Sequence, residues 1–149
     1  MAIASTGGGP VAASRALASQ VHPVFMLPAT ATAIFGALLA GDVSAPLALF
    51  HTLTVGLALY VAHVTDGYVD FYVRGEDDAH PLSRGGCRVA LWGASLAFWL
   101  LALALGVLVG PGALLLTAPG WLIAVAHAPQ LDTNPLGATL GYPGGIALA

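Results

Sequence analysis

The chain has 149 residues, of which 58% are hydrophobic and 7% are charged, with a mean hydropathy of +0.86. A water-soluble domain has about a quarter of its residues charged, so this composition excludes that class and predicts a polytopic membrane protein. The net charge of −3, with only four Lys and Arg residues, excludes a basic nucleic-acid-binding face. The single cysteine, Cys87, excludes an internal disulfide and a cysteine-based zinc site.

The first twenty residues are predicted to lie outside the membrane. They lack the apolar core of a secretory signal peptide. Residues 1–11 are rich in Gly, Ser and Thr, which favours a disordered tail, and residues 12–22 are expected to form a short helix on the membrane surface. We therefore divide the chain into a disordered or interfacial tail, residues 1–20, and a membrane domain, residues 21–149.

Four apolar segments approach the roughly 20 residues that cross a bilayer. They run from about Pro23 to Ala40, from about Pro46 to Phe71, from about Arg88 to Val109 and from about Ala113 to His127. A fifth begins near Leu136 and, at about 1.5 Å per residue, is too short to cross before Ala149, so the sequence looks cut off. The predicted fold class is an all-α transmembrane bundle with about four full spans and a truncated fifth.

The arginines predict an orientation. Arg15 precedes the first span, and Arg74, Arg84 and Arg88 lie between the second and third spans, whereas the loops after the first and third spans carry no Lys or Arg. By the positive-inside rule, the N-terminus and the loop after the second span are expected on the cytoplasmic side of the cell membrane.

The segment AHVTDGYVDFYVRGEDDAHPLSRGG holds most of the acidic residues of the chain. Five of the seven lie there: Asp66, Asp70, Glu76, Asp77 and Asp78. An ionised carboxylate near hydrocarbon costs a few kcal/mol unless it is paired, hydrated or bound to metal, which makes this segment the candidate functional site.

On a helix, Asp66 and Asp70 share one face, which His63 and Arg74 continue, and Gly75 then ends the helix. Helix carboxylates with acids from the following loop form an oxygen-rich set, which suits Mg²⁺ bound through a substrate phosphate. Arg74 and Arg84 could donate to the same phosphate. The competing interpretations are solvated loop acids, a helix-end salt bridge of Asp66 or Asp70 with Arg74 or Arg84, and a His63 that only faces the headgroups.

The stretch DGYVDFYVRGEDDAHPLSRG resembles the first aspartate-rich motif of the UbiA superfamily of intramembrane prenyltransferases. Asp66 falls where that motif has Asn, Asp70 matches the motif Asp, and Tyr68 matches an aromatic between them. Asp77, or Glu76, falls at the distal Asp. Pro81, Leu82 and Gly85 match the following turn, while His80 stands where the family has Arg and Gly67 where Asp is frequent. The first span and the stretch from Ala126 to Gly145 also resemble the family. The resemblance therefore covers residues 20–149 of this chain, which correspond to the first half of a family member.

The resemblance implies Mg²⁺-dependent transfer of a polyprenyl group from its diphosphate to a hydrophobic or aromatic acceptor within a membrane. It implies that Asp66, Asp70 and Asp77 are catalytic, that these three or Glu76 bind the metal, and that Arg74, Arg84, His80 and Tyr68 contact the diphosphate. The family's second aspartate motif does not occur in these residues.

Two other functions are considered. A small membrane protein could use the same acids to bind cations or a partner without catalysis. A CDP-alcohol phosphotransferase begins its motif with Asp-Gly, as at Asp66, but the Ala-Arg and later acids of that motif are absent.

Overall fold

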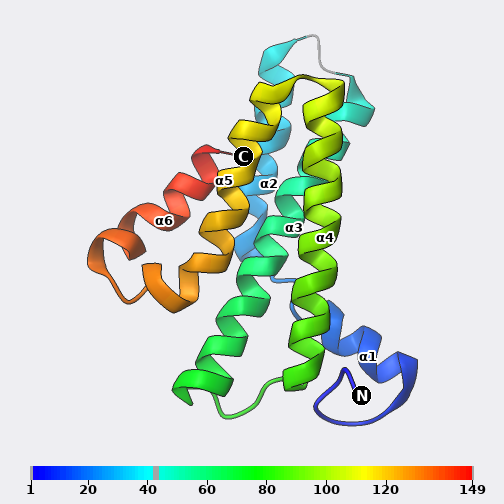
Figure 1. Ribbon diagram of the computed structural model, residues 1–149, viewed down its shortest axis with the longest axis vertical. Helices are drawn as coiled ribbons and strands as arrows, with labels where there is room; N and C mark the ends of the chain where they lie inside the picture. Colours follow the sequence, from blue (N-terminus) through cyan, green and yellow to red (C-terminus); the bar gives the residue numbers. More distant parts are fainter. Residues whose placement is uncertain (1, 42–43, 149) are drawn as a thin grey trace.

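The computed structural model describes residues 2–41 and 44–148, and these form helices joined by short loops (Figure 1). In chain order, the elements are α1 (Gly9–Ala18), α2 (Pro23–Ala40), α3 (Ala45–Val69), η1 (Asp70–Arg74), α4 (Arg84–Leu108), α5 (Pro111–Ala126), η2 (His127–Leu131) and α6 (Pro135–Ala147). η1 and η2 are single π-helical turns that continue α3 and α5. The predicted all-α fold is confirmed.

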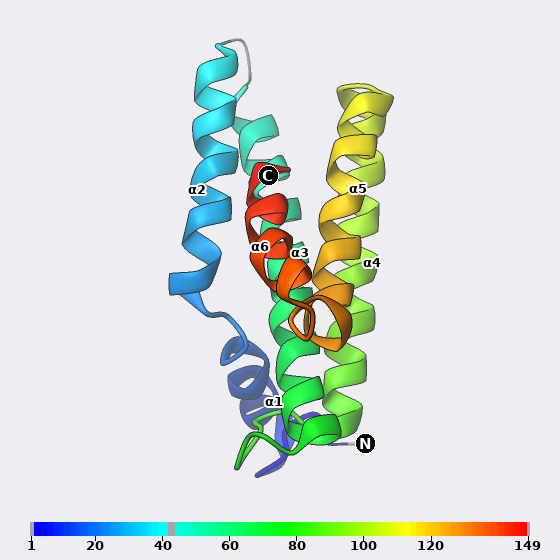
Figure 2. The same cartoon turned by 90° about the vertical axis from the view of Figure 1, so that its left-hand side faces the viewer.

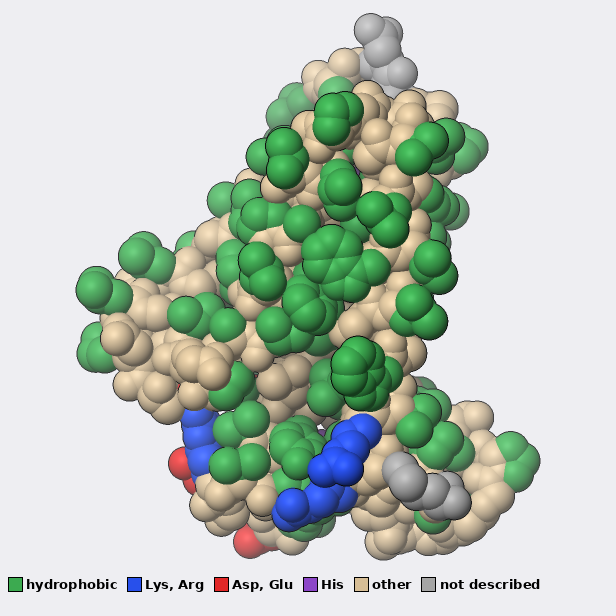
Figure 3. Space-filling view, in the orientation of Figure 1, with side chains coloured by type: hydrophobic (Ala, Val, Ile, Leu, Met, Phe, Trp, Pro, Cys, Tyr) green, Lys and Arg blue, Asp and Glu red, His purple; other side chains and the backbone are tan. Residues whose placement is uncertain are grey.

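Four helices are long and apolar enough to cross a membrane. They are Pro23–Ala40, Ala45–Arg74, Arg84–Leu108 and Pro111–Leu131. Large apolar side chains are exposed along all four, whereas the arginine and acidic side chains visible in Figure 3 gather at the end that carries α1. An apolar surface of this extent needs lipid to cover it, so the molecule is a membrane protein.

Two helices begin earlier than the sequence predicts, α4 because of a capping hydrogen bond and α5 because it starts at a proline. α4 begins at Arg84, four residues before the expected Arg88, since the Ser83 hydroxyl accepts a hydrogen bond from the Gly86 amide at 2.9 Å. α5 begins at Pro111, where proline suits the first helical turn.

The core lies where α3 packs against its neighbours. α3 contacts α2, α4 and α5. Small residues permit close approach of α3, α4 and α5 around Val61 and Phe98, both almost fully buried. The Trp121 indole on α5 donates a hydrogen bond of 3.0 Å to the Ser95 hydroxyl on α4. These contacts make α3 the central element of the bundle.

The last helix covers one side of the bundle. Figure 2 shows α6 in front of α3, between α2 and α5. The Tyr142 hydroxyl on α6 donates to the carbonyl of Phe25 on α2 at 3.0 Å. α6 has 13 residues, fewer than the roughly 20 of a full span, as the sequence predicts for the fifth segment.

The N-terminal residues contact the loop that follows η1. The composition predicts a disordered tail, but the structure pairs residues 2–5 with residues 80–83. The Ser5 amide donates to the Pro81 carbonyl at 2.9 Å, and the Ser83 amide donates to the Ile3 carbonyl at 2.8 Å. Ala4 is only 7% exposed. Backbone pairing is independent of side-chain type, so the composition of the tail does not reveal it.

Candidate functional site

The acidic segment is positioned by the end of the central helix. α3 carries Asp66 in its last turn, and η1 begins at Asp70, so the two carboxylates lie about one turn apart. Gly75 ends the helix in the left-handed conformation, with φ of 69°. The Gly75 and Glu76 amides both donate to the Asp70 carbonyl. The sequence prediction that Gly75 ends this helix is confirmed.

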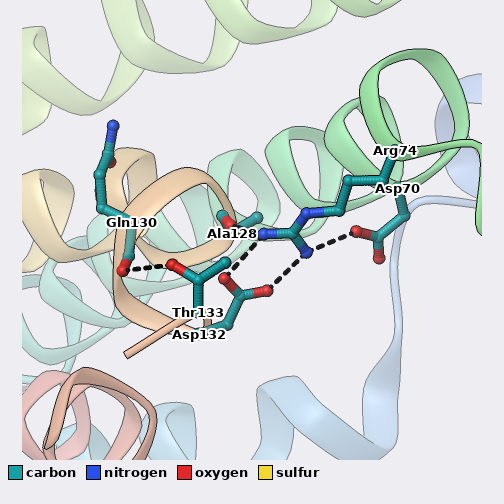
Figure 4. Close-up of polar contacts among 6 residues, drawn as sticks. All are labelled: Asp70, Arg74, Ala128, Gln130, Asp132 and Thr133. Carbon is teal, nitrogen blue, oxygen red and sulfur yellow. Dashed lines mark hydrogen bonds and ion pairs between the residues drawn. The ribbon is translucent and has the colours of Figure 1, made fainter. Parts of the chain in front are cut away.

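Arg74 joins the ends of two spans (Figure 4). Its Nη1 lies 3.1 Å from Asp70 Oδ1 and 2.8 Å from Asp132 Oδ2, and its Nη2 lies 2.9 Å from Asp132 Oδ1. Nη2 also donates to the carbonyl of Ala128 in η2. The guanidinium therefore binds Asp132 through both carboxylate oxygens and holds η1 against η2.

Asp132 becomes part of this site through the second π-helical turn. Its amide donates to the His127 carbonyl at 2.9 Å, which closes η2 and brings the carboxylate to Arg74. The hydrogen bond from Arg74 lowers the pKa of the Asp132 carboxyl below its ordinary value, and the positive charge of Arg74 acts in the same direction. Sequence reasoning missed Asp132 as a partner because 58 residues separate it from Arg74.

The loop acids are not brought to the helix carboxylates. Glu76, Asp77 and Asp78 are all exposed in the loop between η1 and α4. In residues 2–41 and 44–148, no three or more His, Cys, Asp or Glu side chains are arranged to hold a metal ion. The structure thus places Asp66 and Asp70 together on one helix end and leaves Glu76 and Asp77 in solvent.

His80 is buried beneath the loop rather than exposed beside it. It is 6% exposed, and its ring lies near the rings of Phe71 and Tyr72. The Leu82 amide donates to His80 Nδ1 at 3.2 Å, while Nε2 has no hydrogen-bond partner among the described residues. A Cβ atom on Gly67 would lie 2.6 Å from Nε2. Gly67 and His80 are therefore in contact, and the glycine makes room for the imidazole.

Arg84 and Tyr68 both lie near Tyr72. The Arg84 guanidinium carbon is 5.0 Å from the centre of the Tyr72 ring, and Arg84 donates to the Tyr72 carbonyl at 3.3 Å. The rings of Tyr68 and Tyr72 are 5.4 Å apart. Arg84 is exposed and remains able to donate to a ligand.

A cavity of about 360 Å³ lies inside the bundle and reaches the acidic helix end. It is lined by α2, α3, α4, α5, η2 and α6. Most lining residues are apolar, among them Ala29, Val55, Ala58, Phe98 and Ala124. Asp66 is the acidic residue of its wall. The cavity is therefore an apolar space that is bounded at one end by the acidic segment.

Three histidines line the cavity beside Asp66. They are His22, which precedes α2, His63 on α3 and His127 at the start of η2. The rings of His22 and His63 are 4.8 Å apart in an edge-to-face arrangement. From the sequence, only His63 is expected on the acidic face of the helix. The proximity of His22 and His127 to it could not be predicted, because they come from distant segments.

Comparison with known proteins gave no match to this chain, whether to a family model, a curated protein or a solved structure.

Proposed function

We propose that this chain is the N-terminal half of an intramembrane prenyltransferase, which moves a polyprenyl group from its diphosphate to a hydrophobic or aromatic acceptor. The observation that carries the proposal is the apolar cavity that ends at Asp66, one turn from Asp70. A polyprenyl diphosphate has the same two parts, an apolar chain and an anionic head. The resemblance of the acidic segment to the UbiA motif supports the same assignment.

The two helix carboxylates fit the ligand needs of Mg²⁺. This ion takes one or two protein carboxylates, keeps several waters and binds substrate phosphates. Asp66 makes no hydrogen bond through its side chain to another described residue, and Asp70 uses one carboxylate oxygen for Arg74. When bound, Mg²⁺ neutralises the charge that develops on the leaving diphosphate. Asp77 or Glu76 would add a ligand by movement of the exposed loop.

The remaining residues of the motif have separate roles in the proposal. Arg84 is the exposed donor for the diphosphate, together with Tyr68. Arg74 orients Asp70 through their 3.1 Å ion pair and reaches the diphosphate only after leaving Asp132. His80 supports the helix end from beneath the loop.

The proposal is tested by binding of farnesyl diphosphate to the chain in lipid nanodiscs, with and without MgCl₂. We expect binding that requires Mg²⁺ and that weakens about tenfold or more in Asp70→Asn, because a charged ligand oxygen is lost. Asp78→Asn is the matched control, since this neighbouring loop acid is exposed and outside the proposed site. Binding that does not depend on Mg²⁺, or that Asp70→Asn leaves unchanged, would refute the assignment.

One observation favours the second candidate, a non-catalytic membrane protein. Arg74 already binds Asp70, Asp132 and the Ala128 carbonyl, as expected of a structural tie. Mg²⁺-dependent binding without transfer, measured in the natural protein that contains these residues, would support this candidate. Transfer to an acceptor would exclude it.

The orientation is also part of the proposal. Residues 2–5 contact residues 80–83, so the N-terminal segment and the acidic loop lie at the same end of the bundle. The positive-inside rule assigns this end of the bundle to the cytoplasmic side. The membrane is proposed to be the cell membrane.

A further inference from the structure

The acidic and imidazole side chains of the cavity wall gather at one end. His63 and Asp66 lie toward the end of α3, His22 immediately precedes α2, and His127 immediately follows α5. All four therefore lie toward the end of the bundle that carries the acidic loop. The other end of the cavity is lined by apolar residues such as Val55, Ile146 and Leu148.

The imidazoles at this end are free to bind a ligand. The side chains of His22, His63 and His127 make no hydrogen bond to another residue in the ranges 2–41 and 44–148. His63 is partly buried, and its ring has His22 at 4.8 Å and Phe25 at 5.9 Å as aromatic neighbours. A partly buried imidazole without a protein partner gains a hydrogen bond when a polar group enters the cavity.

The chemistry of the cavity wall selects the head group of such a ligand. A neutral imidazole has one donor and one acceptor nitrogen, and a hydroxyl can satisfy both kinds of atom. An ammonium head can only donate hydrogen bonds, so it offers no acceptor to the imidazole N–H groups. A carboxylate head would be repelled by Asp66. A hydroxyl is therefore the group that the three imidazoles and Asp66 accommodate best.

The size of the cavity limits the body of the ligand. Its volume of about 360 Å³ is near the lower end of the roughly 300–1,000 Å³ typical of ligand pockets. Most of the wall beyond the histidines is apolar and includes Val55, Phe98 and Ile146. One or two fused rings, or a short apolar chain, match this space.

We propose that the cavity is a binding site for an apolar ligand with a hydroxyl head, and that His63 and His127 hydrogen-bond this hydroxyl. His22 packs against His63 and fixes its ring. This site adjoins the carboxylates assigned to Mg²⁺ and diphosphate, because Asp66 lines the same cavity. Only the naming of this ligand as the acceptor rests on the proposed function; the binding itself does not require transfer.

The test uses 1-naphthol and 1-methoxynaphthalene as probes, with the chain in nanodiscs and empty nanodiscs subtracted. The two probes have the same rings, but only naphthol has a hydroxyl hydrogen. We expect naphthol to bind about tenfold more tightly, the value of one good hydrogen bond. His63→Phe should reduce this preference, because only His127 then remains as a partner, whereas His51→Phe, on the same helix but outside the cavity wall, should preserve it. Equal binding of the two probes to the unsubstituted chain would overturn the proposal.

A second pair of variants tests the location independently of His63. Gly120 lines the cavity, and Gly93 on α4 does not; in both cases an added Cβ meets no atom within 4 Å. Gly120→Leu should therefore fold and weaken binding of both probes, while Gly93→Leu should change neither. Unchanged binding in Gly120→Leu would place the ligand elsewhere and refute the site. Loss of Mg²⁺-dependent diphosphate binding with naphthol binding intact would refute the proposed function alone.

Discussion

Arg74 shows how a single residue connects two distant parts of this chain. From the sequence, Asp70 has two possible partners, Arg74 and Arg84, and the structure selects Arg74 at 3.1 Å. The stronger contact is the two-oxygen pairing with Asp132. A spacing of four residues predicts the first pair, but no local pattern predicts the second, which depends on how α3 and α5 pack.

The pairing of Arg74 with Asp132 should make stability depend on pH. The pKa of Asp132 is lower in the folded chain than its ordinary value near 3.9, so the stabilisation is complete above about pH 4. It is lost as the pH falls through the folded-state pKa. Thermal unfolding in detergent, followed by tryptophan fluorescence, should therefore show a falling Tm below about pH 4.

Asp132→Asn isolates this contribution. The variant should unfold a few degrees below the unsubstituted chain at pH 7, as expected for a partly exposed ion pair, and the difference should shrink toward pH 3. Asp78→Asn, in the exposed loop, should follow the unsubstituted chain throughout. A difference between Asp132→Asn and the unsubstituted chain that stays constant with pH would show that the ionised pair is not its source.

At the scale of the elements, apolar runs of bilayer length were sufficient to predict the spans. The spans follow from local composition, and they appear as α2 to α5 with their π-helical extensions. The pairing of residues 2–5 with the loop, the burial of His80 and the cluster of histidines could not be predicted in this way. Each depends on contacts between segments far apart in the sequence, which neither hydropathy nor spacing records.

Gly86 should be essential for the pairing of the N-terminal segment. A Cβ atom at Gly86 would collide with the Ile3 carbonyl, which is backbone and cannot rotate away. Gly86→Ala should therefore displace residues 2–5. We expect faster hydrogen exchange at the Ser5 and Ser83 amides and a loss of about 1–3 kcal/mol in the free energy of unfolding.

Gly93→Ala is the matched control for that prediction. Gly93 lies in the same helix, and an added Cβ meets no atom within 4 Å. Alanine is the better helix former, so this variant should be equally stable or more stable by up to about 1 kcal/mol. If Gly86→Ala behaved in the same way, the close approach of Ile3 would not constrain the molecule.

The whole molecule has two chemically different ends. The arginine and acidic side chains visible in Figure 3 lie at the end with α1, and the end of α2 and the start of α3 lie at the opposite end in Figure 1. Because its two ends differ, the bundle has two distinguishable orientations in a membrane. The positive-inside rule predicts the one in which the end with α1 faces the cytoplasm.

The orientation can be measured by labelling single cysteines with a membrane-impermeant maleimide. The native Cys87 is fully buried, so it should react slowly and leave a low background. Asp78→Cys, in the exposed loop, should be labelled only from the cytoplasmic side, and Ser44→Cys, which precedes α3, only from the other side. The reverse pattern would show that the bundle is inserted in the opposite direction.

A ribosome translating this chain makes Ser5 75 residues before its partner His80. By the time the loop around Pro81 leaves the translocon, two spans have already been inserted, and the amino-terminal segment is committed to one face of the bilayer. The hydrogen bonds of Ile3 and Ser5 can then form only in chains whose amino terminus stayed on the face where the loop emerges. Nascent chains in which both spans cross the bilayer thus gain a contact that chains with only one of these crossings lack, which makes insertion of the two spans and completion of folding mutually dependent.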